Sequence, residues 1–135
     1  PYSRVIGVSL HRQVLSNMGN LIFRLLFPIK GVTDYSCAYR AYSAKILKLA
    51  KDIYKQNLIE EHGFSCMAEL LIKLRKLNII ACEVPLILRY DRKSGPSKMN
   101  VIMNIFKTLK MIVRLFLLPK LPFEVVDKLK VKYRL

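Results

Sequence analysis

The sequence predicts an α/β fold in which short extended runs alternate with amphipathic helices. Apolar residues recur at helical spacing in four segments, at residues 11–27, 44–55, 64–76 and 100–118. Three short β-type runs accompany them, at residues 5–10, 79–84 and 86–90. These are the patterns of helices that bury one face and of strands in a small sheet. Because 53% of the 135 residues are hydrophobic, the chain can build a packed core.

The first two helices each have one recognisable end. The helix over residues 11–27 is expected to stop at Pro28, which cannot continue it. Ser43 is a good N-cap for the helix over residues 44–55. Between them, residues 31–40 form a polar turn flanked by aromatic residues, a type of segment that lines a site or seals a core.

The charge of the chain indicates an anionic partner. The net charge is +15, and residues 71–135 hold fifteen Lys or Arg against four acids. Nucleic acid, acidic lipid and a phosphorylated substrate all fit such a surface. Cys37, Cys66 and Cys82 form no C-x-x-C pair, so we expect reduced, buried thiols and no metal site.

Two groups of residues have the chemistry of phosphate binding. Arg12 and Ser16 are four residues apart, so they share a helix face and can address one ligand oxygen, although a solvated polar face is the simpler alternative. Residues 92–98 combine cations, hydroxyls, a Gly and a Pro directly after the β-type run at 86–90. That composition predicts an anion-binding loop at a strand end.

The apolar segment over residues 100–118 is amphipathic. It carries Lys107, Lys110 and Arg114, and each such charge costs about 2.5 to 3.5 kcal/mol at a bilayer centre. At 100° per residue these cations and Asn104 share one arc, which predicts a helix in a membrane interface with its cations toward lipid headgroups. A helix that covers the protein's own core is the alternative. Residues 119–135 are a second short helix or a basic tail.

Six short motifs, taken together, resemble the C-terminal half of a family 2 glycosyltransferase, most closely the dolichol-phosphate or polyprenyl-phosphate mannosyltransferases. The motifs occur in one order: Ser3-Arg4-Val5, Arg12 with Ser16, residues 34–42, Gly63-Phe64 with Glu69, Glu83-Val84-Pro85, and residues 92–98. The resemblance covers about residues 3–115. It implies the C-terminal half of a GT-A catalytic domain over residues 1–98, an interfacial helix over 99–118, and a tail or helix over 119–135.

The resemblance also implies a role for each matching residue. Acceptor phosphate is expected at Arg4, Arg12 and Ser16. The donor diphosphate is expected at Arg92, Ser97 and Lys98. Asp34 is expected to orient neighbouring side chains at the reacting centre, with support from Arg40, Glu69 and Glu83. The family has a Gly where this chain has Ala38 between Cys37 and Tyr39.

The implied reaction moves a sugar, mannose or glucose, from a GDP-mannose or UDP-glucose type donor to a polyprenyl or dolichyl phosphate. It implies membrane association at the cytoplasmic face and no nucleic acid. The Mg²⁺ or Mn²⁺ ligands of the family, an Asp-x-Asp, lie in a nucleotide-binding half that these residues do not contain. We therefore expect this part alone to be inactive. A basic nucleic-acid-binding module and a non-catalytic membrane-surface anchor are the alternatives.

Overall fold

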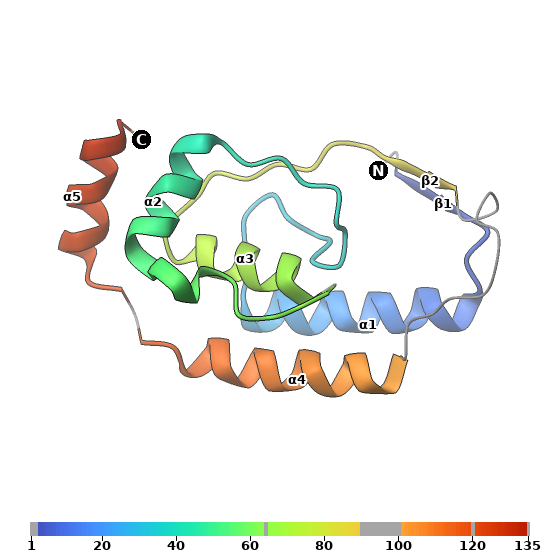
Figure 1. Ribbon diagram of the computed structural model, residues 1–135. Coiled ribbons are helices and arrows are strands. Elements are labelled where there is room, and N and C mark those ends of the chain that lie inside the picture. Colours follow the sequence, from blue (N-terminus) through green and yellow to red (C-terminus); the bar gives the residue numbers. More distant parts are fainter. Residues whose placement is uncertain (1–2, 64, 90–100, 120, 135) are drawn as a thin grey trace.

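The computed structural model describes residues 3–63, 65–89, 101–119 and 121–134. In these ranges helices predominate, and two short strands lie side by side at one end of the molecule (Figure 1). The elements in chain order are β1 (Arg4–Ile6), α1 (Leu10–Leu26), α2 (Ala44–Tyr54), the 3-10 helix η1 (Lys55–Leu58), α3 (Ser65–Arg75), β2 (Ile87–Arg89), α4 (Val101–Leu117) and α5 (Phe123–Tyr133).

The two strands pair in parallel. Arg4 lies opposite Ile87, and Ile6 lies opposite Arg89. Parallel strands run in the same direction, so the chain leaves both at the same end of the sheet. Ile6 and Arg89, the last residues of the two strands, therefore lie side by side at that end.

The expected helix ends are largely confirmed. Pro28 follows α1 directly after its C-cap residue Phe27. Ser43 caps α2, because its side chain accepts a hydrogen bond of 3.3 Å from the N–H of Ile46. Such a bond satisfies one of the amide groups that the first helical turn leaves unpaired.

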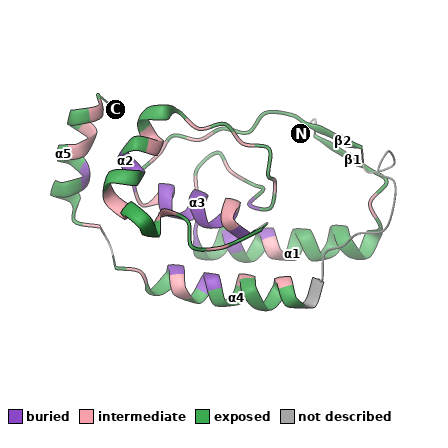
Figure 2. Ribbon diagram, in the orientation of Figure 1, coloured by how far each residue is buried: buried purple, intermediate pink, exposed green. Residues whose placement is uncertain are grey.

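One hydrophobic cluster joins α1, α3 and α4. It contains Phe23 from α1, its C-cap residue Phe27, and Met111 and Leu115 from α4, all buried (Figure 2). Tyr35 from the loop after α1 is fully buried at its centre, stacked on Phe23 at 5.5 Å between ring centroids. Its hydroxyl donates a 2.7 Å hydrogen bond to the Phe27 carbonyl, which satisfies the polar end of a buried aromatic residue.

A second cluster joins α2, α3 and α5. Leu49 and Leu74 are fully buried there, and Val126 of α5 packs against them. The Tyr133 hydroxyl of α5 donates a 2.6 Å hydrogen bond to Asp52 of α2. The final segment is thus a packed helix over most of its length.

The strand expected over residues 79–84 is wrong. That segment is extended but belongs to no sheet, and it contacts the loop that follows α1 through a side chain and a close backbone approach. Gly31 has φ +84°, and a Cβ built on it would lie 2.3 Å from the Ala81 carbonyl oxygen. Loop contacts take the place of a strand partner here.

None of the helices among the described residues has the length and apolar character needed to cross a membrane.

Candidate functional site

The loop after α1 is organised around the Asp34 carboxylate. Its Oδ1 accepts hydrogen bonds from the Ser36 N–H and hydroxyl, both at 2.7 Å, and from the Cys37 N–H at 3.1 Å. The Asn20 amide of α1 donates a fourth, at 3.1 Å. A carboxylate with this many donors tightens the turn and fixes its direction relative to α1.

Glu83 holds the same loop from the other side. Its carboxylate accepts from the Thr33 N–H and hydroxyl, each at 2.5 Å, and from the Asp34 N–H at 2.8 Å. Thr33 and Glu83 are 50 residues apart in sequence. A charged side chain therefore joins two of the sequence-predicted motifs directly.

Two arginines hold the carbonyl side of the loop. Arg40 donates from Nε to the Cys37 carbonyl and from Nη2 to the Asp34 carbonyl, both at 2.9 Å. Arg24 donates from Nε to the Thr33 carbonyl at 2.8 Å. In the part of the chain that the structure describes, Nη1 of Arg40 is buried without a hydrogen-bond partner. The loop is thus bonded through both its N–H and its C=O groups.

Both carboxylates of the network remain ionised at neutral pH. Desolvation raises the pKa of Asp34, but bonds from Ser36, Asn20 and Cys37 together lower it below its ordinary 3.8. For Glu83, desolvation again raises the pKa, but hydrogen bonds from Thr33 and Asp34 bring it below the ordinary 4.5. A carboxylate stabilised in its charged form is a poor proton acceptor and a good orienting group.

Helix α1 presents Ser16 to this loop. The Ser16 and Ser36 hydroxyl oxygens are 3.4 Å apart. Arg12 lies one turn earlier on the same helix face, with an exposed side chain. Ser16, Asp34, Arg40 and Glu83 therefore belong to one connected group, and Arg12 borders it.

Two other predicted site residues, Arg4 and Glu69, lie elsewhere. Arg4 is exposed on β1, and its N–H donates to the Leu86 carbonyl at 3.1 Å. Arg92, Ser97 and Lys98 lie outside the described residues. Glu69 belongs to a separate cluster of charges.

Asn20 is a site residue that the sequence reasoning missed. Besides donating to Asp34, its side-chain oxygen accepts from the Tyr35 N–H at 2.8 Å, and its side chain is buried. It follows Ser16 by four residues, so it lies on the same face of α1. The sequence signal that could have found it is the spacing of four residues between Arg12, Ser16 and Asn20, which places all three on one helix face.

Glu69 anchors α4 to the rest of the fold. It is fully buried and accepts from the N–H groups of Glu60 and Glu61 at 2.9 and 2.8 Å. Lys73 and Arg114 each approach its Oε1 at 2.8 Å. Hydrogen bonds and ion pairs of this number offset the cost of burying a carboxylate.

Arg114 therefore corrects one expectation. The sequence groups it with Lys107 and Lys110 on a lipid-facing arc, but the structure turns it toward Glu69 and Glu61. Lys107 and Lys110 are exposed. Only these two of the three cations are free to face a headgroup layer.

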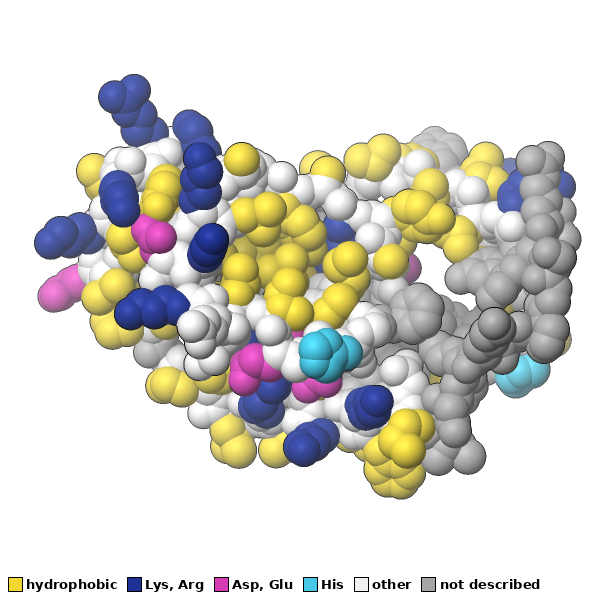
Figure 3. Space-filling view, in the orientation of Figure 1, with side chains coloured by type: hydrophobic (Ala, Val, Ile, Leu, Met, Phe, Trp, Pro, Cys, Tyr) yellow, Lys and Arg dark blue, Asp and Glu magenta, His cyan; other side chains and the backbone are white. Residues whose placement is uncertain are grey.

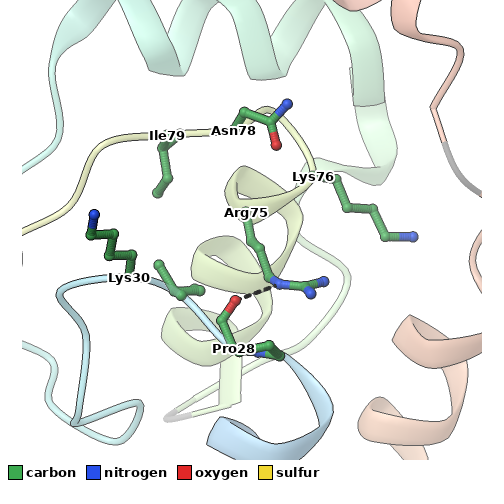
Figure 4. Close-up of a pocket in the computed structure, with 7 residues that line it drawn as sticks. Pro28, Lys30, Arg75, Lys76, Asn78 and Ile79 are labelled. Atoms are coloured by element: carbon green, nitrogen blue, oxygen red, sulfur yellow. Dashed lines mark hydrogen bonds between the residues drawn. The ribbon is translucent and has the colours of Figure 1, made fainter.

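A hollow of about 340 Å³ lies at the junction of helix C-termini, lined by Pro28, Lys30, Arg75 and Lys76 among others. Arg75 donates to the Pro28 carbonyl at 2.8 Å, while Lys30 and Lys76 extend to opposite sides (Figure 4). Lys76 donates to the Leu118 carbonyl at 2.8 Å. Burial, with Arg75 and Lys73 nearby, lowers the pKa of Lys76.

Arg75 and Lys76 donate to carbonyl groups just after α1 and α4, where helices leave C=O groups unpaired. Of the predicted site residues that the structure describes, none lines the hollow. It is a structural junction and not the candidate site.

No group of three or more His, Cys, Asp or Glu side chains that could hold a metal ion occurs within residues 3–63, 65–89, 101–119 and 121–134. No protein-family model, curated protein or solved structure matches the chain.

Proposed function

We propose that the chain is the acceptor-binding part of a GT-A family 2 glycosyltransferase that transfers mannose or glucose from a nucleotide diphosphate to a polyprenyl or dolichyl phosphate. The observation that carries the proposal is the network through Ser16, Asp34 and Glu83. Three motifs that the resemblance treats as parts of one site meet in it.

The parallel sheet supports the same arrangement. Because Ile6 pairs with Arg89, the chain enters α1 and leaves β2 at one end of the sheet. Arg12 lies at the start of α1, and the proposed donor residues Arg92, Ser97 and Lys98 follow Arg89 in sequence. The proposed acceptor residues thus follow one strand of the pair in sequence, and the proposed donor residues follow the other.

The proposed sugar transfer does not require a strong general base. An oxygen of the acceptor phosphate attacks C1 of the sugar, the new O–C1 bond forms, and the bond from C1 to the nucleoside diphosphate breaks. A phosphate monoester has a second pKa of about 6, so the attacking oxygen is already largely deprotonated at neutral pH. Asp34 accordingly positions the loop, and cations hold the two phosphates.

A Mg²⁺ or Mn²⁺ ion would stabilise the departing diphosphate. Its Asp-x-Asp ligands are not among these 135 residues, so this part of the reaction belongs to the nucleotide-binding half. The present residues bind the acceptor, orient the loop and approach the membrane.

Helix α4 supports a reaction at a membrane surface, which we assign to the cytoplasmic face. Phe106, Val113 and Phe116 are 58–66% exposed, and exposed Lys107 and Lys110 lie beside them. Apolar side chains next to lysines are typical of helices that rest in anionic interfaces.

Binding of farnesyl phosphate tests the acceptor assignment without a sugar donor. Arg12→Ala is expected to weaken binding about tenfold, since it removes a charge-assisted bond to phosphate. Lys48→Ala, which removes an exposed charge on α2, is the matched control. Farnesol, which lacks the phosphate, separates head-group binding from adsorption of the tail.

If Arg12→Ala and Lys48→Ala weakened binding of farnesyl phosphate equally, the effect would come from the net charge of the chain. That result would contradict the acceptor assignment. Salt-dependent binding of an oligonucleotide without binding of farnesyl phosphate would favour the nucleic-acid alternative. Transfer of labelled sugar by the enzyme with its nucleotide-binding half present, lowered about 100-fold by Arg12→Ala, would complete the test.

A further inference from the structure

Helix α2 carries a row of exposed lysines on the side away from the core. Leu49 and Ala50 of this helix are buried, while Lys48, Lys51 and Lys55 are exposed. At 100° per residue, with Leu49 at 0°, the three lysines lie at about 260°, 200° and 240°, and Ala50 lies at about 100°. The row extends over about 10 Å of the helix axis. We call these three residues the lysine row.

The lysine row has no acidic partner among the described residues. Asp52 is the one acid of α2, and α5 occupies its carboxylate, which Lys132 approaches at 3.2 Å and the Tyr133 hydroxyl at 2.6 Å. No lysine of the row forms an ion pair within the part of the chain that the structure describes. Like charges three and four residues apart on one helix repel, so the row lowers the stability of α2. A local arrangement that opposes folding is typical of a functional surface.

The lysine row belongs to the basic end of the molecule. Residues 44–58 and 121–134 hold eight Lys or Arg against three acids. In the space-filling view, dark blue side chains gather over this end (Figure 3). Helices α2 and α5 lie opposite the end that contains β1 and β2, where α1 begins (Figure 1). A partner on the lysine row would therefore bind away from the proposed acceptor residue Arg12.

We infer that the lysine row is a docking surface for a second protein, which contacts it through a helix with Asp or Glu residues three and four positions apart. Lys48, Lys51 and Lys55 have this spacing. Two such helices packed side by side place opposite charges at the same intervals along their axes. The inference goes beyond the proposed sugar transfer and does not depend on it.

The side chains of α2 favour an acidic protein over other anionic partners. No large hydrophobic side chain of α2 is exposed, whereas a helix that rests in a bilayer has apolar side chains beside its cations. The row contains no Arg, the residue that suits bidentate contacts to phosphate, and α2 has no exposed aromatic residue on which a base could stack. A second copy carries the same net charge of +15 and would be repelled.

A synthetic peptide tests the inference. The probe is a fluorescein-labelled, alanine-based helix that carries Glu in one row, three and four residues apart. A peptide of the same composition, with its Glu residues spread around the helix, is the control. Fluorescence anisotropy with the full chain measures binding of both, and we expect the peptide with the Glu row to bind more tightly.

Two variants with equal charge show where the peptide binds. The test variant carries Lys48→Gln, Lys51→Gln and Lys55→Gln. The control variant carries three substitutions of exposed lysines outside α2 and α5, namely Lys30→Gln, Lys107→Gln and Lys110→Gln. Each variant loses three charges, so the net charge falls from +15 to +12 in both. The test variant should bind the Glu-row peptide about tenfold more weakly, and the control variant should stay within about twofold of the unchanged chain.

Exchange of charges separates a direct contact from a loss of folding. Lys51→Glu should weaken binding of the Glu-row peptide about tenfold. A peptide with Lys in place of its central Glu should recover most of that loss. Recovery requires a folded α2, and circular dichroism checks the helix content of each variant.

Three results would overturn the inference. Equal weakening by the test and control variants would mean that net charge alone explains binding. Equal binding of the two peptides would mean that the spacing of the lysines has no role. Tighter binding of a duplex oligonucleotide or of phosphatidylglycerol vesicles than of the peptide, lost in the test variant, would assign the lysine row to nucleic acid or to a bilayer.

Discussion

Glu83 binds Thr33 through both carboxylate oxygens, one to the backbone N–H and one to the hydroxyl, each at 2.5 Å. The same carboxylate also receives the Asp34 N–H at 2.8 Å. A side chain from an extended segment thus replaces the backbone pairing that a neighbouring strand would supply. It is the main polar link between the segment before β2 and the loop after α1.

Replacing Glu83 should loosen this loop. Glu83→Gln keeps the size of the side chain but weakens three charge-assisted bonds, so we expect the free energy of unfolding to fall by about 1 to 2 kcal/mol. Glu124→Gln, on the exposed surface of α5, is the control and should change it by less than about 0.5 kcal/mol. Urea denaturation measures both. Equal effects would mean that the bonds to Thr33 and Asp34 contribute nothing.

Acidic pH should destabilise the folded chain through protonation of Asp34 and Glu83. The pKa values of Asp34 and Glu83 are lowered in the folded state, below 3.8 and 4.5, so their stabilisation is fully present above those ordinary values. It is lost as the pH falls through the lower folded-state values. Denaturation series at pH 7 and across the acid range should show this loss. Asp34→Asn should flatten the slope, and an unchanged slope would contradict the assignment.

The Glu69 cluster, which joins α3 to α4, predicts two separable effects on stability. Glu69→Ala removes the fully buried carboxylate that pairs with Lys73, which is 1% exposed and keeps only the 35% exposed Glu60 as an ion-pair partner, and should cost about 3 kcal/mol. Arg114→Ala should cost less, about 1 to 2 kcal/mol, because its side chain is 34% exposed and water screens its ion pairs. Thermal or urea unfolding measures both losses.

Lys110→Ala is the matched control on the same helix. It should leave the stability nearly unchanged and weaken binding to anionic vesicles about fivefold, as expected for one cation at a membrane surface. Arg114→Ala should show the opposite pattern if it is structural. Loss of vesicle binding by a folded Arg114→Ala protein would return this arginine to the lipid-facing group.

Two glycines predict opposite effects on stability. Gly31→Ala places a methyl group 2.3 Å from the Ala81 carbonyl oxygen at φ +84°, so it should cost at least about 2 kcal/mol. Gly19, within α1, has open space around a built Cβ, and Gly19→Ala should add about 0.5 to 1 kcal/mol. Circular dichroism during urea unfolding distinguishes the two. A neutral Gly31→Ala would show that the two loops can separate freely.

Periodicity and capping predicted the helices well because both depend on neighbours in sequence. Ser43 caps α2 as its position before an apolar-periodic segment indicates. The end of α1 near Pro28 and the start of α3 near residue 64 were also foreseeable to within a residue or two. Residues 79–84 misled the same reasoning, since an apolar run reads as a strand whether or not a partner strand lies beside it.

The sequence by itself determined the helical segments, the strongly basic charge and the residue types of the candidate site, because these follow from composition and local spacing. Only the tertiary structure decided which polar residues meet. It joined Glu83 to Thr33, added Asn20 to Asp34, and turned Arg114 inward to Glu69. The physical reason is that a buried or partly buried charge takes its partners from whatever packing brings within about 3 Å, and packing between distant segments leaves no local pattern in the chain.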